Sequence, residues 1–198
     1  MKKTIISISA VVLMALMISG CAKVPQVELD AAKAAIETLK GAEVNRYMPA
    51  EFNALQDSFN EATAAVETEK SKFFLTRSYK EITEKLNGIT ASIEDLKTKS
   101  EERKAQVRDE VQAAITEVTN LVAENKTLLK KAPKGKEGKA ALEAIQNDIT
   151  VIEASLTEVN TLVTNGDYLT AQDKINAAKA KATSIMEELK AAIAKVRR

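Results

Sequence analysis

The stretch LEAIQNDITVIEASLTEVNTLV, residues 142–163, decides the fold of this chain. Its large apolar side chains recur at alternating intervals of three and four residues, which places them in one stripe along an α-helix. The stretch contains no Pro and no Gly, and it lacks the apolar–polar alternation of a strand. It therefore predicts a long amphipathic helix that must bury one face against other helices. The stripe consists of Leu142, Ile145, Ile149, Ile152, Leu156, Val159 and Val163.

Similar spacing extends over most of the chain and predicts four further helices. The first begins near Glu28 and reaches the mid-40s, and the second begins at Pro49, which suits a first helical position. A capping box, Ser78-Tyr79-Lys80-Glu81, opens the third, which continues through Asn87-Gly88 to Lys131. Asn165-Gly166 ends the fourth helix and Asp167 caps the fifth.

The apolar stripes repeat along the chain at an offset of about 90 residues. Tyr79 and Tyr168 occupy equivalent places just after a turn, and the flanking stripes also match. Coincidence among heptad patterns is the alternative. The repeat predicts an all-α fold, an elongated antiparallel helical bundle of two stacked three-helix units that share one long central helix. The units span residues 28–100 and 101–198. The polar positions Ser100 and Arg103 mark their junction, where we expect neither unit to bury the helix.

The N-terminus carries a pattern of another kind. Lys2 and Lys3 precede an uncharged, mostly apolar segment, residues 4–18, which is too short for an ordinary spanning helix. Ile18-Ser19-Gly20-Cys21 follows, with the only cysteine of the chain. This pattern resembles the lipobox of bacterial lipoproteins. The resemblance implies a diacylglycerol on Cys21, a signal peptide over 1–20 and a lipidated tether over 21–27. The alternative is an uncleaved signal anchor, or cleavage elsewhere with Cys21 incidental.

The resemblance also implies a location. Ala22 rather than Asp follows the cysteine, which in Gram-negative sorting implies the outer membrane, with the chain facing the periplasm. The mature region is similar to Ala-rich, all-helical lipoproteins of unknown function. A looser resemblance is to murein lipoprotein, which ends in a Lys joined to peptidoglycan. This chain ends in Val196-Arg197-Arg198, so that covalent linkage is not expected.

The composition argues against most chemistry. The chain has no His and no Trp, and its 29 basic and 28 acidic residues nearly cancel. The commonest general base and metal ligand is therefore missing, and a dominant basic field for nucleic acid is lacking. The neighbouring carboxylates Glu101-Glu102 and Glu187-Glu188 diverge on a helix and do not face each other. We expect no enzyme activity, no cofactor, no metal site and no nucleic-acid partner.

A group of basic residues surrounds the connection near residue 135 and the C-terminus. Its members are Lys130, Lys131, Lys134, Lys136, Lys139, Lys195, Arg197 and Arg198. In the predicted fold they converge as an anion-docking tip, with peptidoglycan or an acidic envelope protein as partner. The alternative is that Lys and Arg simply favour helix C-termini and solvated loops.

Aromatic residues are concentrated in the first half of the chain, where most of them fall on the apolar stripes. Phe73 lies on the stripe of the second helix, whereas the adjacent Phe74 should project sideways. Phe74 would then touch lipid headgroups or a partner, or cover the turn.

These observations favour a non-enzymatic, lipid-anchored helical spacer or docking scaffold of the bacterial cell envelope. The alternative is a periplasmic binding module or chaperone that holds an apolar ligand or an unfolded client between its helices. An apolar pocket larger than about 300 Å³ would favour the alternative.

Overall fold

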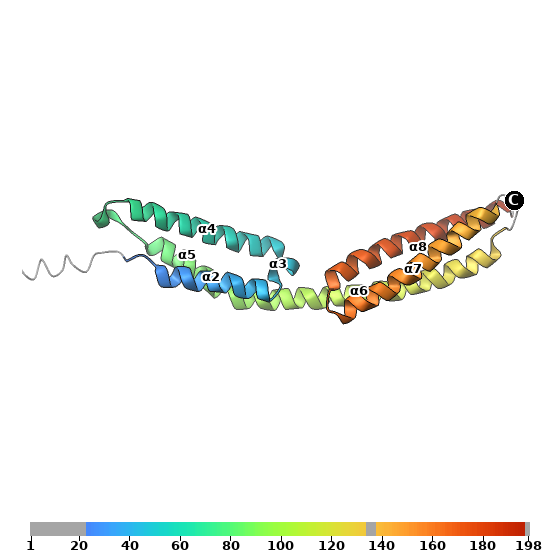
Figure 1. The fold of residues 1–198 in the computed structure, drawn as a ribbon, viewed down its shortest axis with the longest axis horizontal. Coiled ribbons are helices and arrows are strands. Elements are labelled where there is room, and N and C mark those ends of the chain that lie inside the picture. The colour runs from blue at the N-terminus through green and yellow to red at the C-terminus, as the bar shows by residue number, and fades with distance from the viewer. Residues whose placement is uncertain (1–22, 134–137, 197–198) are drawn as a thin grey trace, which may run out of the picture. The chain divides into compact units, whose positions relative to one another are not determined.

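The computed structural model describes residues 23–133 and 138–196, and every regular element within those ranges is helical. The prediction of an all-α helical bundle is therefore confirmed. The chain divides between Glu101 and Glu102 into two compact units, unit 1 and unit 2 (Figure 1).

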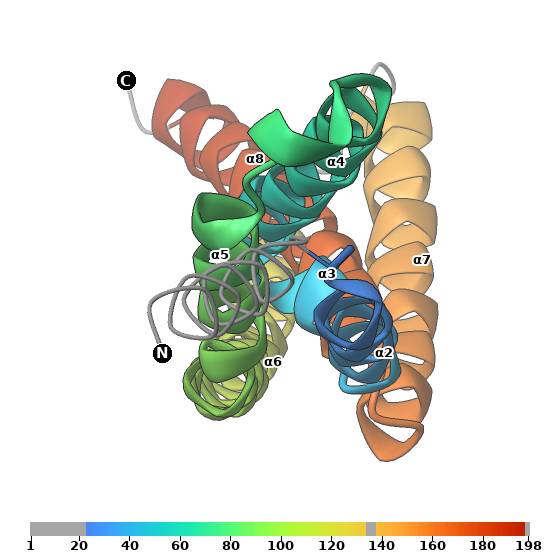
Figure 2. The same ribbon diagram turned by 90° about the vertical axis from the view of Figure 1, so that its left-hand side faces the viewer.

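Unit 1 is a three-helix bundle with two short helical segments in its connections. Figure 2 shows α2, α4 and α5 at the three corners of the unit, and each of them packs against the other two. The elements are α2 (Gln26–Gly41), α3 (Val44–Tyr47), α4 (Pro49–Ser71), η2 (Phe74–Thr76), α5 (Lys80–Ala91) and the start of α6 (Ile93–Lys131).

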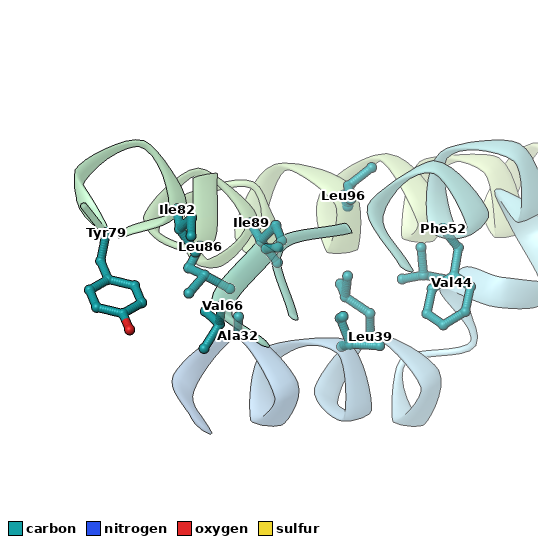
Figure 3. Close-up of a cluster of buried hydrophobic side chains, with 12 residues drawn as sticks. Ala32, Leu39, Val44, Phe52, Val66, Tyr79, Ile82, Leu86, Ile89 and Leu96 are labelled. Carbon is teal, nitrogen blue, oxygen red and sulfur yellow. The ribbon is translucent and has the colours of Figure 1, made fainter. Parts of the chain in front are cut away.

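The apolar stripes of these helices meet in one core, part of which is drawn in Figure 3. Ala32 and Ala62 are almost fully buried, and these small side chains let the helices approach closely. The larger buried side chains are Ile36, Leu39, Val44, Phe52, Val66, Tyr79, Ile82, Leu86, Ile89 and Leu96.

The first helix ends earlier than the sequence predicted. α2 stops at Gly41, and Glu43 adopts a left-handed backbone conformation with φ of 57°. The Arg46 guanidinium donates to the Glu43 carboxylate at 2.7 Å across this turn. Val44 and Tyr47 of the short α3 are buried. Their packing on the core directs the chain toward Pro49, where α4 begins.

The predicted helix from Ser78 to Lys131 is interrupted, but not at its glycine. α5 runs straight through Gly88, as expected, and the break falls at Ser92 between α5 and α6. The Ser92 hydroxyl donates to the Ile89 carbonyl at 2.8 Å, which competes with the helical bonding there. Helical bonding resumes where the Leu96 amide donates to the Ser92 carbonyl at 3.0 Å.

The capping box at Ser78 does not form. α5 begins at Lys80 without a side-chain cap, and the Ser78 amide donates instead to the Glu69 carboxylate at 3.1 Å. The capping box does not form because α4 places the Glu69 carboxylate within hydrogen-bond distance of the Ser78 amide.

The unit boundary falls within α6. The prediction that α6 is left uncovered at Ser100 is wrong, since Ser100 is only 1% exposed. Arg103 is half-buried and donates to the Glu110 carboxylate at 3.3 Å.

Unit 2 is made of the rest of α6 together with α7 (Gly138–Thr164) and α8 (Tyr168–Val196). α7 ends in a Schellman motif, in which the Asp167 amide donates to the Leu162 carbonyl and the Gly166 amide to Val163. Gly166 has φ of 78°, the conformation that this motif requires. On α6 the structure buries Ile115 and Val122, while the adjacent Ala114 and Leu121 are only half-buried.

One polar side chain lies in the core of unit 2. Asn125 of α6 is fully buried, and its Nδ2 donates to the Ala182 carbonyl of α8 at 2.7 Å. Its Oδ1 has no hydrogen-bond partner among the described residues. A buried Asn of this kind costs stability and disfavours other helix registers, because a shifted pairing would leave the amide unbonded.

Two glycine substitutions test this backbone. Gly166→Ala should lower the free energy of unfolding by about 1–2 kcal/mol, because an L side chain is strained at φ of 78°. Gly88→Ala should raise it by about 1 kcal/mol, since Ala is the better helix former and a Cβ there meets no atom within 4 Å. Denaturant unfolding monitored by circular dichroism measures both changes. Shifts of the same sign would contradict the left-handed conformation of Gly166 or the helical conformation of Gly88.

Candidate functional site

The sequence predicts a lipid attachment site at Cys21 and a tether over residues 21–27. Cys21 lies outside the described residues, so its lipidation stays a prediction. The predicted tether, 21–27, is shorter than expected because Val24 already packs against the core of unit 1 and Pro25 is buried. The Leu29 amide donates to the Pro25 carbonyl at 3.0 Å, which ties this segment to the first turn of α2.

The predicted basic tip is described in part. Lys130 and Lys131 end α6, Lys139 lies in the first turn of α7, and Lys195 lies in the last turn of α8. These three helix ends lie at the same end of unit 2 (Figure 1). Lys134, Lys136, Arg197 and Arg198 lie outside the described residues.

The electrostatics of this tip are those of a solvated surface. Lys139 is 80% exposed, and its Nζ lies 4.0 Å from the Glu143 carboxylate, which offsets part of the charge. Lys130, Lys131 and Lys195 are also exposed. Such a group attracts an anion through a field that salt screens within about 8–10 Å. It fits weak, salt-sensitive docking better than tight binding.

A groove between α6 and α7 lies beside two of these lysines. Its volume is about 420 Å³, and it is lined by Leu129, Lys130, Lys139, Leu142, Glu143 and Gln146. Sequence reasoning placed Leu142 in the core and did not single out Leu129 or Gln146. The adjacent pair Leu128-Leu129 could have pointed to Leu129, because a single stripe cannot bury both neighbours on a helix, but no pattern pointed to Gln146.

The described residues offer little to catalysis. The pairs Glu101-Glu102 and Glu187-Glu188 are exposed. The pKa of Glu61 is lowered, first by the hydrogen bond from Lys85 and then by its charge, which is ordinary ion pairing. Within 23–133 and 138–196, no three potential metal ligands come together.

Comparison of the chain with protein-family models, with curated proteins and with solved structures finds no match in any of the three. Among the helices of the described residues, none has the length and apolar character needed to cross a membrane.

The groove makes a direct prediction about ligand binding. An apolar anionic dye such as anilinonaphthalene sulfonate should gain fluorescence in the groove, where two leucines meet two lysines. Gln146→Trp should fill the groove and remove most of the signal. Gln112→Trp, on the exposed face of α6, is the matched control and should leave it unchanged. Equal dye binding by both variants would exclude the groove as the site.

Proposed function

We propose that this protein is a non-enzymatic, lipid-anchored helical spacer or docking scaffold of the bacterial cell envelope, held in the outer membrane and facing the periplasm. The observation that carries the proposal is the lipobox, Ile18-Ser19-Gly20-Cys21, behind a lysine-led apolar segment. The helical units support the proposal, because their buried side chains are mostly the apolar stripe of each helix, which packs against the neighbouring helices. The solvated lysines at one end of unit 2 support a docking role, with peptidoglycan or an acidic envelope protein as partner.

A binding module or chaperone is the second candidate. The groove between α6 and α7 favours it, because about 420 Å³ falls within the range of small-molecule sites. Two leucines are a small apolar lining for such a site, which is why the scaffold ranks first.

The anchor is tested at the N-terminus of the mature protein. Mass spectrometry of that peptide should find Cys21 as the first residue, carrying a diacylglycerol thioether and an amide-linked acyl chain. Several chains give far stronger attachment than one, so Cys21→Ser should move the protein from the membrane fraction into the soluble fraction. An unmodified Cys21, or cleavage at another bond, would refute the proposal.

The docking tip is tested by removing charge. A variant with Gln at Lys130, Lys131, Lys139 and Lys195 should sediment less with purified cell wall at low salt and show a flatter salt dependence, because half of the positive charges of the tip are removed. A control with Gln at Lys33, Lys40, Lys80 and Lys99, four exposed lysines of unit 1, loses the same charge and should behave as wild type. Equal losses in the two variants would assign the binding to net charge alone.

A further inference from the structure

Exposed apolar side chains gather at one end of unit 1. Phe73, Phe74 and Leu75, in the connection between α4 and α5, are 65%, 50% and 67% exposed. Val27, in the first turn of α2, is 78% exposed, and α2 begins at this same end of the unit (Figure 1). The only other large hydrophobic residue exposed to this degree in the described ranges is Val151 of α7. Single exposed hydrophobics are ordinary, but a cluster marks a contact surface.

The prediction that Phe73 packs on the stripe of the second helix is wrong, and the reason is how α4 ends. α4 stops at Ser71, and the Arg77 guanidinium donates to one carbonyl of its last turn and to the carbonyl of the residue that follows it. Arg77 Nη2 donates to the Lys70 carbonyl at 2.7 Å, and Nε donates to the Lys72 carbonyl at 3.0 Å. These bonds satisfy acceptors that a helix end leaves open, so Phe73 is not carried onto a further helical turn.

Other polar bonds close the connection, which we call the η2 loop, residues 72–79. The Glu69 carboxylate accepts from Lys72 Nζ at 2.6 Å and from the Ser78 amide at 3.1 Å, joining the two ends of the loop. The Lys72 hydrogen bond, and then the Ser78 amide, lower the pKa of Glu69, so its carboxylate is ionised at neutral pH. The Phe73 carbonyl accepts from both the amide and the hydroxyl of Thr76.

The apolar side chains of the η2 loop therefore project from a loop whose shape is set by polar contacts. The rings of Phe73 and Phe74 lie 4.7 Å apart between centroids and are tilted by 58°, so they form one apolar wedge. Their exposure results from the hydrogen bonds of Arg77 and Glu69, which hold the loop in this conformation.

The proposed lipid attachment site, Cys21, comes two residues before the first described residue of unit 1. Lys23 is the first described residue, and Val24 packs on the core. Two residue steps of about 3.8 Å can span no more than about 8 Å between Lys23 and Cys21. Acyl chains on Cys21 would place a bilayer surface beside the end of unit 1 that displays the wedge.

We propose that the η2 loop is a second membrane contact, which inserts Phe73, Phe74 and Leu75 into the interface of the bilayer that holds Cys21. The inference rests on the lipid anchor proposed above and adds a contact made by the folded chain itself. Phe and Leu are typical of segments that lie in the headgroup and acyl boundary. A single lipidated residue leaves unit 1 free to turn about its attachment, whereas a second contact a short distance away fixes its orientation.

A tryptophan scan tests this contact, since the chain has no Trp of its own. The mature acylated protein carrying Phe74→Trp is reconstituted in vesicles of phosphatidylethanolamine and phosphatidylglycerol, with and without lipids brominated on the acyl chains. Its emission should shift to shorter wavelength and be quenched by the brominated lipid. Val151→Trp is the matched control, because Val151 is 54% exposed but lies in unit 2, and its emission should change several-fold less. Adding Phe73→Ser and Leu75→Ser to the Phe74→Trp protein should abolish most of the quenching.

The outcomes separate this inference from the anchor on which it rests. Mass spectrometry and flotation are run on the same samples, and circular dichroism checks that each variant keeps its helicity. An acylated, floating protein without quenching of Phe74→Trp overturns the loop contact and leaves the anchor in place. A chain that is neither acylated nor vesicle-bound overturns both. An emission shift that needs no vesicles and grows with protein concentration would show that a second copy covers the wedge, which also overturns the membrane contact.

Discussion

Burial of one apolar stripe per helix is the interaction on which both units depend. Leu, Ile and Val side chains at heptad-like spacing pack inward, and most of the remaining surface of each helix is solvated. A bundle with so narrow a core has few buried positions that could hold catalytic or ligand-binding side chains. This is the physical reason why the sites proposed above lie on helix ends and connections.

Polar contacts select the pairing that the apolar stripes alone would leave open. In unit 2 the Asn125 side chain bonds to the Ala182 carbonyl, and ion pairs link each pair of helices. Those pairs are Lys126 with Glu153, Lys179 with Glu117, and Lys181 with Asp148. Each exposed pair contributes less than about 1 kcal/mol, but all of them are lost together if a helix shifts by a turn. Their combined effect is on register more than on stability.

The connection between the second and third helices differs between the two units, although the apolar stripes predicted a repeat. In unit 2 the Schellman motif at Gly166 joins α7 to α8 within residues 165–167. In unit 1 the corresponding connection is the η2 loop, in which Arg77 and Glu69 replace the glycine motif with side-chain bonds. Both units pack one apolar stripe per helix, while their connections are held by different hydrogen bonds.

The sequence by itself determined the helical class, the places of most buried side chains and the beginnings of α4 and α8. These features depend on local periodicity and on Pro or Gly at defined positions, which are visible in one segment at a time. It also predicted that the ends of α6 and α8 and the beginning of α7 lie at one end of unit 2, because antiparallel helices bring alternate ends together. The lipidation of Cys21 and the docking role of the basic residues outside the described ranges remain predictions from the sequence.

Only the tertiary structure decided the break at Ser92, the burial of Ser100, the exposure of Phe73 and the groove beside Leu129. Each depends on a competition between contacts distant along the chain or on the exact end of a helix. The Ser78 amide bonds to Glu69 of α4 rather than to its own capping partner, and Arg77 ends α4 before Phe73 can join the stripe. Heptad spacing states which face of a helix is apolar, but it does not state where the covering helix stops.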